Sequence, residues 1–115
     1  MASVLNEYLQ ETTALTADST SKGFLLSGRT TDFIGTVVAS SVNAATTIAA
    51  KIQHSHDNLN WFDLITFTNI VGVSGAQAVL APTGGCLPFV RSVVVLTGAT
   101  KSATVDIKLW YDTKG

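Results

Sequence analysis

Apolar and polar side chains alternate along much of this chain, and the alternation is clearest near its C-terminal end. Between residues 103 and 111 every second position is apolar, and the positions between hold Thr, Asp, Lys and Trp. Because successive side chains of a strand point to opposite faces, this period of two predicts a half-buried β-strand. Residues 45–54 alternate in the same way. Residues 61–68 follow across a turn rich in Asp and Asn, so these two segments predict a hairpin.

Further strands are expected along the rest of the chain. Residues 12–17, 24–27 and 33–39 fit short strands, and residues 71–80 fit a loop with a short strand. Residues 89–97 are apolar on both faces, which is typical of a central strand. About seven or eight strands, with turns every 8–12 residues or so, favour an all-β fold: an antiparallel β-sandwich or a small barrel.

The first eleven residues follow a different pattern. Their apolar side chains fall at helical spacing: Val4, Leu5, Tyr8 and Leu9. This spacing predicts a short helix or arm over residues 1–11, ahead of a single β domain over residues 12–115. Two roles are open for this segment, since it either covers the core of its own chain or grips a neighbouring subunit.

Composition narrows the function classes. The 115 residues suit one domain, and the single cysteine, Cys86, excludes a disulfide scaffold. The apolar neighbours of Cys86 disfavour a reactive thiolate. A net charge of −1 without clustered Lys or Arg argues against a nucleic-acid partner. Neither a membrane-length apolar run nor a signal-peptide pattern is found, so no membrane partner is expected.

The low charge also carries positive information. Charged residues make up 13% of the chain, about half of the usual ~25%. A soluble monomer normally covers its surface with charge. This surface therefore either uses Ser and Thr in place of charge or is partly covered by partners.

The strongest candidate for a metal site is the pair of histidines beside the predicted turn. His54 and His56 alternate on a strand, so both rings fall on one face and offer two ligands. Asp57 is adjacent, and a third ligand would come from Asp63 or Asp32. The simpler interpretation, two surface histidines flanking a turn, is the one we favour. No metal, cofactor or catalytic residue is expected.

Arg91 and the aromatic residues are candidates for contacts with a partner. Arg91 lies within the apolar strand 89–97, where a guanidinium needs a partner; by register Asp106 or Asp63 would serve, and an interface is the alternative. Three aromatic residues either fill the core or an interface between subunits, or form a platform for a sugar: Trp61, Phe62 and Trp110. Asn58, Asn60 and Asp57 stand close enough in sequence to keep the sugar alternative open.

Two segments carry a resemblance to a known class of proteins. Residues 51–64, Lys-Ile-Gln-His-Ser-His-Asp-Asn-Leu-Asn-Trp-Phe-Asp-Leu, resemble the strand, Gln-x-Ser-x-Asp-Gly-x-x-Trp, strand hairpin of small structural proteins of tailed bacteriophages. Residues 87–98, followed by 104–109, are similar to their next element, in which an aromatic-Val-Arg strand leads through a Gly turn into the last strand. Asn58 stands where Gly is commoner, and Asn also accepts left-handed backbone geometry.

The resemblance implies a non-enzymatic capsid decoration or cement protein. Such a protein would be a homotrimer bound to the major capsid protein, located on the capsid surface of the virion and made in the host cytoplasm. It brings no catalytic residues with it. The residues expected to bind partners are Val4, Leu5, Tyr8, Leu9, Phe62, Arg91 and Trp110. A discoidin-like carbohydrate-binding module shares the Ser-x-Asp-x-x-x-Trp hairpin and is the first alternative, and a tail or head-completion protein is the second.

Overall fold

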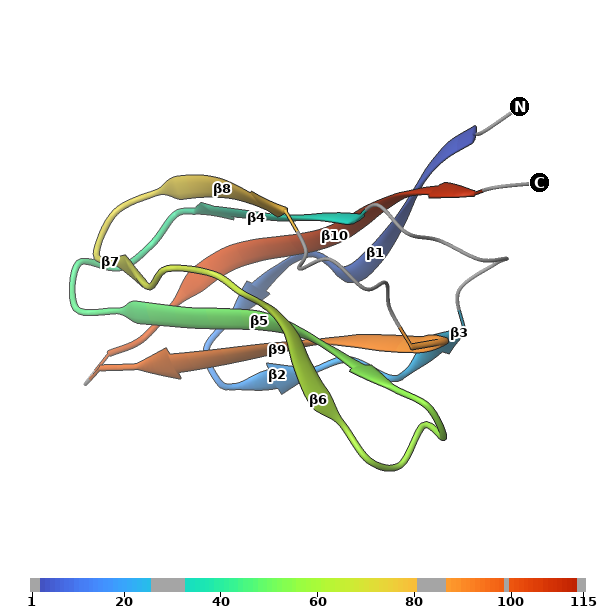
Figure 1. Cartoon of the computed structure of the whole chain (residues 1–115). Coiled ribbons are helices and arrows are strands. Elements are labelled where there is room, and N and C mark those ends of the chain that lie inside the picture. The colour runs from blue at the N-terminus through green and yellow to red at the C-terminus, as the bar shows by residue number, and fades with distance from the viewer. Residues whose placement is uncertain (1–2, 26–32, 81–86, 99, 114–115) are drawn as a thin grey trace.

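The chain folds into two antiparallel sheets packed face to face (Figure 1). The computed structural model describes residues 3–25, 33–80, 87–98 and 100–113. These residues form ten strands and no helix, so none of them belongs to a helix that would be long and apolar enough to cross a membrane. The sandwich is elongated, with extents of 46 × 28 × 21 Å. The all-β sandwich expected from the sequence is confirmed.

The first sheet has four strands in the order β1-β10-β4-β8. Their bounds are Ser3–Leu15 for β1, Ala103–Thr113 for β10, Phe33–Ser40 for β4 and Gly75–Leu80 for β8. The two longest strands are neighbours, and Ser3 pairs with Thr113. The beginning of β1 and the end of β10 therefore lie side by side at one end of the sandwich (Figure 1).

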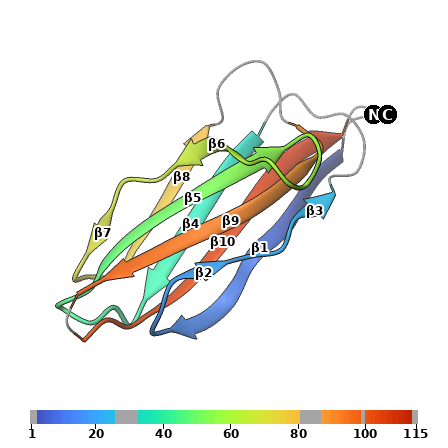
Figure 2. The same cartoon turned by 90° about the horizontal axis from the view of Figure 1, so that it is seen from below.

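The second sheet is built on the long strands β9 and β5, which lie in front of β10 and β4 in the view from below (Figure 2). Strand β6 pairs with β5, and three two-residue strands complete the sheet: β2 and β3 pair with β9, and β7 pairs with β5. The bounds are Phe89–Thr97 for β9, Thr47–Ser55 for β5, Phe62–Thr66 for β6, Ser19–Thr20 for β2, Phe24–Leu25 for β3 and Ile70–Val71 for β7.

The core lies between the sheets and follows the alternation of the sequence. In β10 the side chains of Val105, Ile107 and Leu109 have no exposed surface, while their neighbours along the strand are partly exposed. In β9 the inward side chains include Val90 and Val94. Both flanks of β9 are paired, by β5 on one side and by β2 and β3 on the other. The prediction that residues 89–97 form a central strand is thus confirmed.

The expected strand count was lower than the observed one. The additional elements are β2 and β7, which are only two residues long and fall in segments too polar or too glycine-rich to show alternation. The hairpin expected from residues 45–68 is present as β5 and β6. Gly35 of β4 brings the sheets together here, since a Cβ at that position would lie 2.8 Å from Ile65 Cδ1 and 2.9 Å from Ile52 Cδ1.

The helix predicted for residues 1–11 is wrong. This segment is the larger part of strand β1, which runs without a break from Ser3 to Leu15 and pairs with β10. The register of the pair shifts between Tyr8 and Gln10 and again between Gln10 and Thr13. Each shift inserts one extra residue as a β-bulge, which disrupts the period of two. The broken period looked helical in the sequence, and the hydrogen bonds offered by β10 override that local preference.

Candidate functional site

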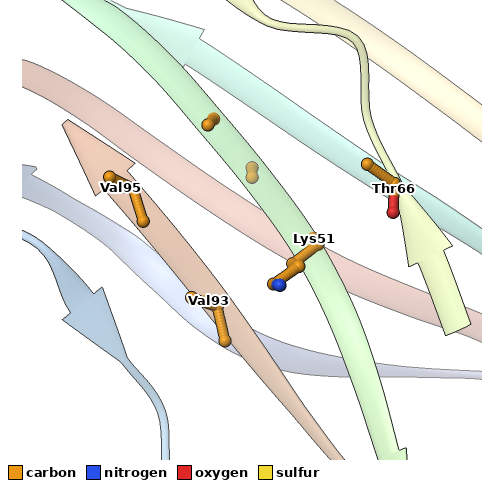
Figure 3. Close-up of a pocket in the computed structure, with 6 residues that line it drawn as sticks. Lys51, Thr66, Val93 and Val95 are labelled. Carbon is orange, nitrogen blue, oxygen red and sulfur yellow. The ribbon is translucent and has the colours of Figure 1, made fainter. Parts of the chain in front are cut away.

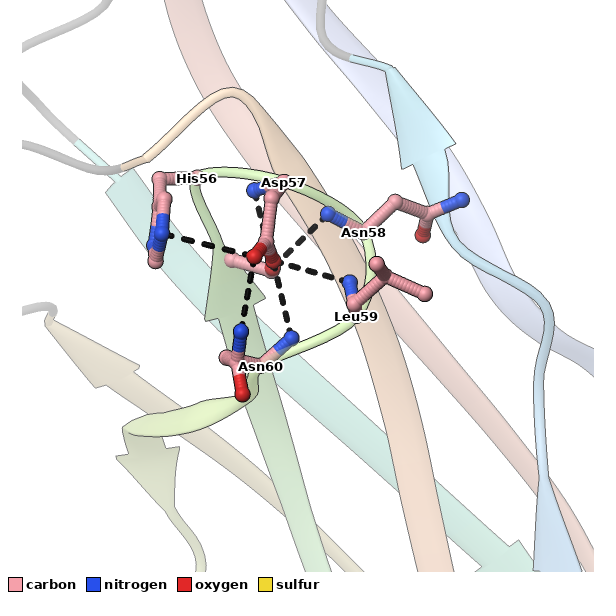
Figure 4. A network of polar contacts seen from close by, with 6 residues as sticks. His56, Asp57, Asn58, Leu59 and Asn60 are labelled. Carbon is pink, nitrogen blue, oxygen red and sulfur yellow. Dashed lines mark hydrogen bonds and ion pairs between the residues drawn. The ribbon is translucent and has the colours of Figure 1, made fainter.

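The turn between β5 and β6 is organised around the carboxylate of Asp57 (Figure 4). Oδ1 of Asp57 accepts hydrogen bonds from the backbone N–H groups of Asn60 at 2.8 Å and Leu59 at 2.9 Å. Oδ2 accepts one from the side-chain amide of Asn60 at 2.7 Å. The buried hydroxyl of Ser55 donates to Oδ1 and accepts from the N–H groups of Asp57 and Asn58. Every one of these groups closes the turn.

These donors favour the ionised form of Asp57. The backbone N–H groups of Asn60 and Leu59, followed by the side-chain donors, hold the pKa of Asp57 well below its ordinary value. Asn58 adopts a positive φ of 62°, as expected for the place where the resembled hairpins carry Gly. The carboxylate is thus engaged in holding the turn, which leaves it poorly suited to act as an acid, a base or a metal ligand.

A row of polar side chains crosses the outer face of the second sheet beside this turn. Lys51 Nζ lies 3.1 Å from Asp63 Oδ1, and Gln53 Nε2 donates to the same oxygen at 3.0 Å. Gln53 Oε1 accepts from Nε of Arg91 at 2.9 Å, and the Arg91 guanidinium lies over the ring of Trp61 at 4.4 Å. We call this set, Lys51, Asp63, Gln53, Arg91 and Trp61, the polar row.

The register of the sheet builds the polar row. Gln53 pairs with Arg91 across β5 and β9. Gln53 also pairs with Asp63 across β5 and β6, because a bulge between Ile52 and Gln53 shifts the register there. The expectation that Arg91 pairs with Asp63 or Asp106 is wrong, since Arg91 bonds to Gln53 and stacks on Trp61. The hydrogen bond from Gln53, assisted by Lys51, holds the pKa of Asp63 below its ordinary value.

A shallow depression of about 160 Å³ lies next to the polar row on the same face (Figure 3). Val93 and Val95 of β9 form one wall, Thr66 of β6 lies across from them, and Lys51 rises between (Figure 3). Alanines at positions 49 and 50 complete the lining. Ligand pockets for small molecules usually have volumes of about 300–1,000 Å³, so this depression has room for one side chain rather than for a cofactor.

The two histidines meet different partners, and the described residues bring no third metal ligand to them. His54 is partly buried, which lowers its pKa, and its Nδ1 accepts a hydrogen bond from the backbone N–H of Leu87 at 3.1 Å. His56 is exposed, lies 3.4 Å from Asp57 and stacks on the ring of Phe62. Within the part of the chain that the structure describes, no three His, Cys, Asp or Glu side chains come together as metal ligands. Asp32 and Cys86 lie outside the described residues.

The outer face of the four-stranded sheet is a second candidate surface. Ile34 and Val38 of β4 are 42% and 44% exposed. Ala76 and Ala78 of β8 are exposed beside them. Trp110 of β10 lies on the same face, where its indole N–H donates to Thr36 Oγ1 at 3.0 Å. We call these residues (Ile34, Val38, Ala76, Ala78 and Trp110) the apolar outer face.

The partner-binding residues expected from the sequence fall in different places. Phe62 is 51% exposed, and Arg91 and Trp110 lie on opposite outer faces of the sandwich. Leu9 is only 3% exposed and packs in the core, which corrects its assignment to a partner. The backbones of Val4, Leu5 and Tyr8 pair with β10, and their side chains lie outside the described residues.

Sequence reasoning missed Gln53 and Lys51 as members of a site. The signal was present, because residues 51 and 53 alternate with apolar neighbours and therefore share the outward face of the predicted strand. What was absent from the sequence is the register that brings β6 and β9 to either side of them.

Comparisons with known proteins support the fold. No family model matches the chain, and no curated protein matches it. Among solved structures, the chain is similar to one in the structure of infectious bursal disease virus, Gx strain, with a TM-score of 0.66 and 14% sequence identity. The similarity covers 100% of this chain and 34% of that chain, so this chain spans about a third of the length of the viral one. At this identity the similarity is one of fold.

Proposed function

We propose that this chain is a non-enzymatic structural protein of a virus particle, and specifically a decoration or cement protein on the capsid of a tailed bacteriophage. In this proposal it assembles as a homotrimer, binds the major capsid protein and stabilises the head. The resemblance of residues 51–64 and 87–98 to phage structural proteins supports the phage assignment. The fold shared with a chain in the structure of a virus supports the structural role.

The observation that carries the proposal is the apolar outer face. An open sheet in water normally turns polar side chains outward, yet Ile34 and Val38 are exposed here on either side of Thr36, with Ala76 and Ala78 exposed on the neighbouring strand β8. Contiguous exposed apolar residues mark sites of association. A protein that works by covering other subunits needs such a surface, whereas a monomeric enzyme gains nothing from it.

The proposal is tested with phage heads that lack this protein. They are purified from a phage that normally encodes the chain and from which the gene for it has been deleted. The purified protein is added, and bound and free protein are separated by sedimentation. We expect saturable binding and an increased temperature of head disruption. Substitution of Val38 by Lys, which puts a charge into the apolar outer face, is expected to weaken binding. Lys at exposed Val71, on the other sheet, is the matched control.

Localisation on the intact phage separates the proposal from its structural alternatives. Gold-labelled antibody against the chain is expected over the surface of the head. Label confined to the tail, or to the head–tail junction, would replace decoration with a tail or head-completion role. The mass of the purified protein in solution tests the trimer.

Sugar binding is a second candidate, favoured by one observation. Phe62 is half exposed, and its ring stacks with His56 at a centroid distance of 6.3 Å. His56 and the side-chain amide of Asn60 both contact Oδ2 of Asp57. Rings and amides together are typical of sugar sites. Trp61, however, already has Arg91 over its ring. A glycan panel that quenches Trp fluorescence saturably, and fails to do so with Phe62 replaced by Ala, would favour this candidate.

A further inference from the structure

Arg91 is held in a fixed orientation, and toward the described residues most of its N–H donors are unused. A guanidinium has five N–H donors, and within the described structure Arg91 uses only Nε, which bonds to Gln53. It forms no ion pair with any described residue, since Asp63 is engaged by Lys51 and Gln53. Its plane is supported by Trp61 at 4.4 Å. A guanidinium fixed in this way loses little conformational entropy on binding a carboxylate with two hydrogen bonds.

The local charge favours an anionic ligand. The chain as a whole has a net charge of −1. Within the polar row, however, Lys51 and Arg91 carry two positive charges against the single negative charge of Asp63. Among these residues, the charge without an opposite partner is that of Arg91. A surface with one fixed positive group complements a partner that presents one carboxylate.

The near edge of the depression lies two residues from Arg91. Val93 lines this edge and follows Arg91 by two residues along β9, and Lys51 pairs with Val93 as Gln53 pairs with Arg91. The far edge is formed by Val95 and Ala49, two residues further on. Two residues along a strand span about 6.6–6.8 Å on one face. An extended segment with a carboxylate at one position and a small apolar side chain two positions away reproduces this spacing.

We propose that the outer face of the second sheet binds an extended acidic segment of a partner protein. Its Asp or Glu carboxylate pairs with Arg91, and an apolar side chain two residues away enters the depression beside Lys51, which Val93, Val95 and Thr66 also line. The depression, at about 160 Å³, fits one side chain and not a whole small molecule. The identification of the partner as a capsid subunit rests on the proposed function. The chemistry of the bound segment is inferred from this site alone.

Binding of short peptides tests the site without any virus particle. The probe is an acetylated and amidated peptide, Thr-Glu-Thr-Val-Thr, titrated into isotope-labelled full-length protein and followed by the NMR signals of the Arg91 Nε–H and the Trp61 indole. We expect saturable shifts at these two signals with a Kd on the order of 1 mM. A peptide with Gln in place of Glu, and one with Glu and Val adjacent, are expected to bind about tenfold more weakly or worse.

Variants of the protein give the matched comparison. Arg91→Gln is expected to weaken binding of the probe by about tenfold or more, and Arg91→Lys by less, since the charge remains but the two-pronged geometry is lost. Lys22→Gln removes the same charge from an exposed residue near β3 and is expected to change Kd by less than about twofold. Val93→Glu fills the depression and offers Arg91 an internal carboxylate, so it is also expected to weaken binding of the probe. This second variant tests the site if Arg91→Gln does not fold.

The outcomes separate this site from the proposed function. If the protein binds the peptide but does not bind heads from the gene-deleted phage, the site stands and the capsid role fails. If heads bind Arg91→Gln or Val93→Glu as tightly as the wild type, and the peptide causes no shift, the capsid role stands and this site is wrong. Equal binding of the Glu and Gln peptides also overturns it. The proposal is also overturned if N-acetylneuraminic acid binds more than tenfold tighter than the peptide, because the carboxylate would then come from a glycan.

Discussion

The guanidinium carbon of Arg91 lies 4.4 Å from the centre of the Trp61 ring. This contact links the central strand β9 to the residue that precedes β6. A positive charge over an aromatic face is attracted by the negative face of the ring. This contact, with the hydrogen bond from Nε to Gln53, explains how a charged residue stands within an apolar strand with no carboxylate partner among the residues that the structure describes.

The coupling between these two residues is measurable. In a double-mutant cycle of Arg91→Gln and Trp61→Leu, we expect an interaction free energy of about 0.5–1 kcal/mol. Urea denaturation of the four proteins supplies it. The same cycle with Trp110→Leu, on the other sheet, should show additivity, and an equal coupling there would contradict the assignment.

Two neighbouring valines of β9 test the alternation of the core. Val94 has no exposed surface, whereas Val93 lies on the partly exposed outer face. Val94→Ala should lower the free energy of unfolding by about 2–3 kcal/mol, because it leaves a cavity between the sheets. Val93→Ala, which removes the same atoms, should cost less than about 1 kcal/mol. Equal losses in urea denaturation would refute this assignment of faces.

Removal of residues 1–11 should destabilise the whole sandwich rather than detach an arm. These residues supply most of β1, and Leu9 packs in the core. Their loss would expose the edge of β10 and remove a buried leucine. The point variant Leu9→Ala alone should lower the free energy of unfolding by about 2–5 kcal/mol. Thermal unfolding checks both variants. A truncated protein with an unchanged melting temperature would restore the interpretation of this segment as an independent arm.

Acid should weaken the contact between His54 and Leu87. Burial lowers the pKa of His54 below 6.5, and neutral Nδ1 accepts the N–H of Leu87. A histidine with a lowered folded pKa contributes its full stability above the unfolded pKa of 6.5 and loses it as pH falls through the folded value. Between pH 7.5 and 5 we expect a loss of about 0.5–1 kcal/mol, the net value of a hydrogen bond.

The substitution His54→Asn keeps an acceptor and removes the titration. Urea midpoints of this variant should therefore depend less on pH than those of the wild type. If the urea midpoints of His54→Asn depended on pH as strongly as those of the wild type, the titrating group would be misassigned.

The turn around Asp57 should be sensitive to more extreme acid. Its depressed pKa means that its stability is fully present above the ordinary carboxyl pKa, about 3.8, and is lost as pH falls below it. Asp57→Asn should lower the melting temperature at pH 7 and narrow the difference between pH 7 and pH 3. Asn58→Gly, in the same turn at a positive φ, should leave that difference unchanged. Equal behaviour of the two variants would contradict the role of the carboxylate.

The sequence alone determined the class of the fold and the inward face of strands β5 and β10. An uninterrupted period of two leaves one arrangement that buries the apolar side chains, so the faces of β5 and β10 follow directly from it. The turn at residues 55–60 was also predictable, because Asp and Asn side chains close turns through bonds to nearby backbone. Long-range pairing is not needed for either inference.

Only the tertiary structure decided what bulges and register control. Two bulges hid β1 from the periodicity, and its pairing with β10 made a strand of residues that looked helical. Without the bulge in β6, Leu64 would stand opposite Gln53; with it, Asp63 does, and Leu64 turns into the core. The place of Asp63 in the polar row depends on that single inserted residue, whereas Gln53 meets Arg91 through the unshifted register of β5 and β9. A one-residue shift exchanges the two faces of a strand, and which shift is stable depends on packing between segments far apart in the chain.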